Sequence, residues 1–164
     1  MRNLYDTEEF ENAYTYLGHD LGAFWTESQT VFRLWAPTAR EVTLLLYRDG
    51  LGGEPLTSQQ LHPEKNGTWI ARRMGNLKGL YYTYLVNVDG QAKEACDPYA
   101  KAVGVNGQRA MVIDLRETNP AGWTEDRSPF RGKGITDAVL YELHIRDLSM
   151  HRSSHIQNKG KYLG

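Results

Sequence analysis

Hydrophobic and polar residues alternate along several short stretches between residues 29 and 115. The apolar positions that recur at every second residue are Phe32, Leu34 and Ala36, then Val42, Leu44 and Leu46, then Tyr82, Tyr84, Val86 and Val88. A period of two is typical of β-strands that bury one face. Residues 68–72 predict a further strand, whereas residues 51–65 predict mainly loop, with a short edge strand around Leu56.

Turn-forming pairs separate these strands. Asp89-Gly90 and Asn106-Gly107 supply residues that readily adopt positive φ, which tight hairpin turns require. Each is followed by chain that can return as a strand, the second by residues 110–115. Short strands with turn signals about every 8–12 residues predict a mainly β fold, an immunoglobulin-like antiparallel β-sandwich over residues 19–115.

The chain on either side of this region has a different character. Residues 1–18 predict a lead-in with one short helix that Asp6 caps, Glu9 reaching back to it. Residues 116–134 are rich in Gly and Pro and predict a linker.

A second kind of strand is predicted after the linker. Residues 138–146 are apolar enough for a strand buried on both faces, as in parallel sheets and α/β barrels. No helix and partner strands follow it, so residues 135–164 are interpreted as the first strand of an incomplete (β/α)8 barrel.

Composition excludes several function classes. Hydrophobic residues make up 40% and the net charge is −1, which is ordinary for a globular domain and gives no support for nucleic-acid or membrane partners. No apolar run approaches the roughly 20 residues of a membrane span. A single cysteine excludes an internal disulfide, and without a signal-peptide pattern the expected location is cytoplasmic. No Asp-x-Asp-type loop occurs, so no metal or cofactor is expected.

Three stretches of the sandwich region carry a family resemblance. Residues 31–37, 79–84 and 97–100 resemble the β-sandwich that precedes the barrel in α-amylase-superfamily debranching enzymes, classed as carbohydrate-binding module family 48. Residues 101–107 look like the exit from that module in type I pullulanases, of glycoside hydrolase family 13. Residues 141–149 resemble the first barrel strand of those enzymes, and residues 158–164 the loop after it. Isoamylases and branching enzymes differ where Asp147 stands.

The resemblance implies an activity for a parent protein. Pullulanases hydrolyse α-1,6-glucosidic branch points in pullulan, starch or glycogen limit dextrins with retention, which needs two carboxyl groups roughly 5–5.5 Å apart. In the family those residues lie on later barrel strands, so no catalytic residue is carried over and this chain alone is expected to be inactive. Asp147 and Ser149, after the predicted barrel strand, are candidates for a supporting role. The implied partners are an α-glucan and the remainder of the barrel.

Sugar contacts within the sandwich are a separate question. Glucan-binding relatives use two exposed tryptophans and a lysine, but Leu85 occupies the lysine position and neither tryptophan is present. Trp25, Tyr47 and Tyr81 are the candidate stacking residues. We therefore expect a module that docks on the barrel and associates weakly with glucan. The alternatives are a stand-alone glucan-binding or regulatory module without enzyme activity, and the N-terminal part of another debranching or branching enzyme.

Overall fold

The computed structural model describes residues 4–164, which form two compact units. Among the described residues, the first unit ends at Asn119 and the second is Pro120–Gly164. Each is described by itself below.

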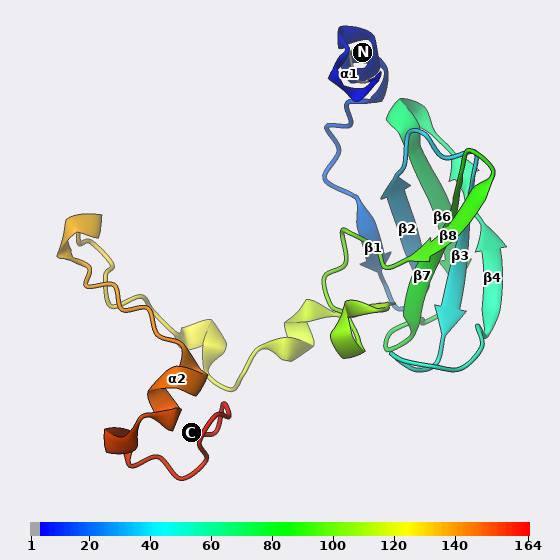
Figure 1. Ribbon diagram of the computed structural model, residues 1–164. Coiled ribbons are helices and arrows are strands. Elements are labelled where there is room, and N and C mark those ends of the chain that lie inside the picture. The colour runs from blue at the N-terminus through cyan, green and yellow to red at the C-terminus, as the bar shows by residue number, and fades with distance from the viewer. Residues whose placement is uncertain (1–3) are drawn as a thin grey trace. The chain divides into compact units, whose positions relative to one another are not determined.

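The first unit is an antiparallel β-sandwich (Figure 1). One sheet has the order β1-β2-β6-β5, with β1 Gly22–Trp25, β2 Gln29–Trp35, β6 Thr68–Met74 and β5 His62–Pro63. The other has the order β4-β3-β7-β8, with β4 Thr57–Gln60, β3 Glu41–Tyr47, β7 Tyr81–Val88 and β8 Gln91–Ala95; β9, Ala110–Met111, also pairs with β7. The prediction of a mainly β, antiparallel sandwich is confirmed.

The core lies between the two sheets and follows the predicted alternation. Phe32 of β2, Leu44 of β3, and Tyr82 and Tyr84 of β7 are all fully buried. Leu44 lies opposite Tyr84 in the β3–β7 register, and the rings of Phe32 and Tyr82 meet edge to face at 5.0 Å between centroids. Burial of these inward faces supplies most of the driving force for folding.

The two predicted hairpin turns have different outcomes. Asp89 and Gly90 have φ of 51° and 80° and join β7 directly to β8, as predicted. Asn106 and Gly107 also have positive φ, but they belong to a 3-10 turn, η3 (Val105–Gly107), inside a wider loop closed by the Val103–Ala110 bridge. The predicted strand over 110–115 is accordingly shortened to β9.

The N-terminal helix forms with a different cap from the predicted one. After a 3-10 turn, η1 (Leu4–Asp6), helix α1 spans Glu8–Tyr14, and the Thr7 side chain accepts a hydrogen bond from the Phe10 amide. Asp6 lies one residue too early to cap it. Residues 1–3 of the predicted lead-in lie outside the described residues. No helix over residues 4–164 is long and apolar enough to cross a membrane.

The second unit consists of turns and one short helix in its described residues (Figure 1). A 3-10 turn, η4 (Leu115–Thr118), closes the first unit, and the second contains η5 (Trp123–Glu125), η6 (Ile135–Asp137), α2 (Ile145–Met150) and η7 (Arg152–Ser154).

The strand predicted over residues 138–146 is not formed. Residues 138–144 have no regular structure, and α2 begins at Ile145 with the His144 ring accepting a hydrogen bond from the Asp147 amide. A strand of this kind needs neighbours that pair with its edges and cover its faces. Without them Val139, Leu140 and Tyr141 are 80–92% exposed, and local hydrogen bonds favour a helical turn.

Candidate functional site

A groove of about 460 Å³ runs along β1, between this edge strand and the chain that follows β9. Its walls are formed by residues 23–27 and 113–116, together with Lys101. β1 belongs to one sheet and β9 pairs with β7 of the other, so the groove joins segments that are far apart in sequence.

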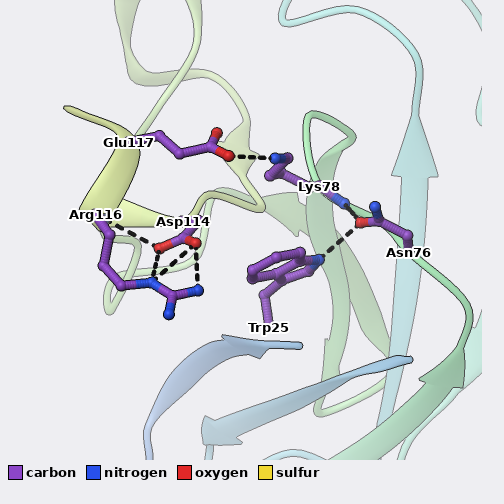
Figure 2. Close-up of polar contacts among 6 residues, drawn as sticks. All are labelled: Trp25, Asn76, Lys78, Asp114, Arg116 and Glu117. Carbon is purple, nitrogen blue, oxygen red and sulfur yellow. Dashed lines mark hydrogen bonds and ion pairs between the residues drawn. The ribbon is translucent and has the colours of Figure 1, made fainter. Parts of the chain in front are cut away.

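Trp25 is the largest side chain of the groove, and its ring is held in place from the side (Figure 2). Its Nε1 donates a hydrogen bond to Asn76 Oδ1 at 2.9 Å, and the same oxygen accepts from the Lys78 amide at 3.0 Å. The Lys78 ammonium lies 5.5 Å from the indole centroid, within cation–π range. These contacts fix the orientation of the ring. Because Trp25 is only partly buried, the ring forms an aromatic wall of the groove.

Asp114 and Arg116 form the polar wall (Figure 2). Asp114 caps η4 by accepting the Arg116 amide hydrogen at 3.0 Å, and the Arg116 guanidinium donates from Nη2 to Asp114 Oδ2 at 2.6 Å. These hydrogen bonds lower the pKa of the Asp114 carboxyl to about 2. Asp114 is therefore ionised at physiological pH. Beside this pair Lys78 forms an ion pair with Glu117 at 2.6 Å.

A second ring and a further cation complete the site. The Lys101 ammonium lies 4.0 Å from the ring centroid of Phe24, whose side chain is 37% exposed. The groove thus combines two apolar rings with flanking charged donors and acceptors. Such a combination suits a ligand with an apolar face and hydroxyl groups around its rim.

Tyr47 was a predicted stacking residue, and it lies outside this groove. It is only 3% exposed, and the Arg109 guanidinium lies 3.4 Å from its ring centroid. Its hydroxyl donates to Glu94 Oε1 at 2.7 Å, as does the hydroxyl of Thr83. Burial and the bond to Glu94 raise the pKa of Tyr47. Its ring has no open face for a sugar, which disfavours that role.

Tyr81, the third predicted stacking residue, is partly exposed on β7 and also lies apart from the groove. Its ring packs closely over two glycines: a Cβ at Gly50 or Gly104 would come within 2.9–3.0 Å of Tyr81 Cε1. The ring therefore serves local packing. Of the three predicted residues, only Trp25 lies in the groove.

The two residues predicted to support the barrel lie in the second unit. Asp147 is exposed on α2. Ser149 is buried, its hydroxyl donating to the Arg146 carbonyl at 3.0 Å and accepting from the Gly160 amide at 2.7 Å. In this structure Ser149 therefore stabilises the fold of its own unit.

Sequence reasoning found Trp25 but not its neighbours. Asn76 is 51 residues away along the chain, and Lys101 and Asp114 lie further still. No local pattern connects them, because only the tertiary fold of the two sheets brings them together. Among residues 4–164 no cluster of three or more His, Cys, Asp or Glu side chains is arranged to hold a metal ion.

The fold defines the first unit as a β-sandwich module. Residues 20–100 match the family Carbohydrate-binding module 48 (Isoamylase N-terminal domain). The wider similarity is more specific, and the chain belongs to the type I pullulanase family, matching its N-terminal part.

That assignment rests on similarity over nearly the whole chain. Pullulanase of Bacillus subtilis is 37% identical over 96% of this chain and 21% of its own length, and chloroplastic pullulanase 1 of Arabidopsis thaliana is 32% identical over 87% and 16%. The crystal structure of a mutant pullulanase from Paenibacillus barengoltzii complexed with maltotriose is 46% identical with a TM-score of 0.85, covering 96% of this chain and 24% of that one. The chain spans about a fifth of the length of the curated relatives it matches.

Proposed function

We propose that this chain is the N-terminal part of a pullulanase that hydrolyses α-1,6-glucosidic branch points in pullulan, starch or glycogen limit dextrins. The sandwich acts in it as a docking and glucan-associating module. The observation that carries the proposal is the extent of the similarity, which covers 96% of the chain and so includes both units. A stand-alone binding module would need no counterpart of the second unit.

The second unit contributes the first strand of the catalytic barrel in this proposal. Residues 138–146 carry apolar side chains on both faces, and Val139, Leu140 and Tyr141 are almost fully exposed here. Burying four such side chains between neighbouring strands stabilises a protein by about 6–12 kcal/mol. The relatives are about five times longer, so the covering strands come from the remainder of such an enzyme. Asp147 and Ser149 would then lie at the C-terminal end of the strand, near the active-site face.

The hydrolytic step needs an acid and a nucleophile placed across the scissile bond. A retaining glycosidase positions these two carboxyl groups about 5–5.5 Å apart. We assign neither role to a residue of this chain. Glu142 and Asp147 lie in the exposed segment around the start of α2, where nothing orients them towards a common substrate atom. The activity therefore belongs to the complete enzyme.

A chimera tests the proposal. The segment of Bacillus subtilis pullulanase that matches this chain is replaced by residues 1–164, and release of reducing ends from pullulan is measured. We expect the chimera to hydrolyse pullulan while the isolated 164-residue chain releases no sugar. The control is the same chimera with Val139→Asp and Leu143→Asp, which should lose activity because the strand cannot be buried. A chimera that folds but releases no sugar would contradict the proposal.

A further inference from the structure

We propose that the groove beside Trp25 binds a short linear α-glucan segment, with a sugar ring stacked on Trp25 and hydroxyls bonded to Arg116 and Lys101. The inference rests on the proposed function and deepens it, because it assigns the contact with glucan to one site on the sandwich. Trp25 lies on β1, in a different sheet from Leu85 of β7, the position at which glucan-binding relatives would place their site.

The Trp25 ring is already held in one orientation by contacts within the protein. Trp25 Nε1 already donates to Asn76 at 2.9 Å, so its polar atom requires nothing from the ligand. The same bond and the nearby Lys78 ammonium hold the indole in one orientation. Because the ring is already ordered, binding loses little side-chain entropy. A pyranose ring presents a face of C–H groups that fits against such a surface.

The polar wall offers hydrogen-bond donors at the rim of the ring. The Asp114 side chain is only 11% exposed, and its two oxygens already accept four hydrogen bonds from Arg116, so Asp114 orients the guanidinium. The Arg116 guanidinium has five N–H donors, of which Nε and Nη2 reach Asp114, and Lys101 carries three. Vicinal sugar hydroxyls can accept hydrogen bonds from these donors and donate to the exposed Glu27 carboxylate.

The charges of the groove favour a neutral ligand. Lys101 and Arg116 balance Glu27 and Asp114 along its walls, and the adjacent Lys78 and Glu117 are paired with each other. A phosphate-rich or strongly acidic ligand would meet two carboxylates, and a cationic one would meet two basic groups. A neutral polyhydroxylated chain meets neither penalty. The site at Tyr47 offers no comparable surface, because Arg109 already covers that ring.

NMR titration of the 164-residue chain tests the inference. Two-dimensional ¹H–¹⁵N spectra are recorded with maltotetraose up to about 10 mM, and with β-linked cellotetraose as the stereochemical control. We expect the Trp25 indole resonance and the amides of residues 113–116 to shift with maltotetraose, with a dissociation constant on the order of 1 mM. Cellotetraose should shift them less, because its straight chain does not follow the same path along the groove.

Three variants sharpen the test. Trp25→Ala should weaken binding at least about tenfold, because it removes the stacking surface. Since Trp25 also packs against the core, the exposed Lys101→Ala serves as a second variant, with an expected loss of about threefold. Trp123→Ala, which removes an exposed tryptophan from the second unit, is the matched control and should leave the affinity unchanged.

Three outcomes would overturn the inference. Shifts confined to the face around Tyr81 and Leu85 would move glucan association to another site, and an absence of shifts at the highest concentration would remove it from the sandwich. Equal weakening by Trp25→Ala and Trp123→Ala would show non-specific contact. None of these outcomes touches hydrolysis by the chimera, so failure of the groove and failure of the proposed function are distinguishable.

Discussion

Asp97 is a buried carboxylate whose two oxygens each accept a hydrogen bond. Tyr82 donates its hydroxyl to Oδ2 and the Tyr99 amide donates to Oδ1, both at 2.8 Å. These bonds join β7 to the turn after β8 and explain at the level of atoms why an Asp-Pro-Tyr sequence stands there. Burial outweighs them and raises the pKa of the Asp97 carboxyl above its ordinary value.

The raised pKa of Asp97 predicts a pH dependence of stability. The unfolded chain has a carboxyl pKa near 3.9, so between that value and the higher folded pKa the folded protein binds more protons. The stabilisation due to the neutral carboxyl is therefore complete below about pH 3.9 and is lost as the pH rises through the folded pKa. Asp97→Asn removes this titration, so the free energy of unfolding of the variant should rise relative to wild type as the pH increases through this window.

Urea denaturation of both proteins between about pH 3.5 and 7 measures the effect. Comparing the two curves cancels the contributions of other carboxyl groups, such as Asp114, whose pKa is lowered. Curves that stay parallel over the whole range, or that diverge in the opposite direction, would show that burial does not control this carboxyl.

Individual strands of the sandwich differ in how far their sequence determines them. β2, β3 and β7 are seven or eight residues long with alternating apolar positions, and all three were predictable from that pattern. β1 has four residues and begins with Gly22, and β8 is exposed along its whole length, so neither carries an alternating signal. Their positions depend on pairing with a longer neighbour.

The same dependence on distant neighbours explains why the groove and the structure of the second unit could not be predicted from the sequence. Trp25 stands out as an aromatic residue, but Asn76 and Asp114 reach it only through the tertiary fold of the two sheets. The segment 138–146 has the composition of a buried strand, yet composition does not supply hydrogen-bonding neighbours. Local preference predicts an element where that element can bury its own face, and fails where burial depends on another part of a protein.

The two faces of β3 give an element-level prediction. Leu44→Ala removes a fully buried side chain opposite Tyr84 and should lower the free energy of unfolding by about 2–5 kcal/mol. Leu45→Ala, at the next position on the outward face, should cost clearly less because that side chain is only partly buried. Chemical denaturation measures both. Equal losses would contradict the assignment of the core to the inner faces.

The whole chain combines a self-sufficient unit with one that leaves apolar surface exposed. The sandwich buries its aromatic and aliphatic side chains between two sheets, whereas Ile135, Val139, Leu140 and Tyr162 of the second unit are each about nine-tenths exposed. Exposed apolar groups on this scale mark a surface that another part of a protein covers. In our account that part is the remainder of a pullulanase barrel.

Amide hydrogen exchange of residues 138–149, compared between the 164-residue chain and the pullulan-hydrolysing chimera, tests the central claim most directly. In the monomeric chain we expect these amides to exchange rapidly, while those around Phe32, Leu44 and Tyr84 stay protected. In the chimera residues 138–146 should become as protected as the sandwich, because they form a strand between two neighbours. Strong protection of this segment in the monomeric chain alone, or its continued rapid exchange in an active chimera, would contradict the account.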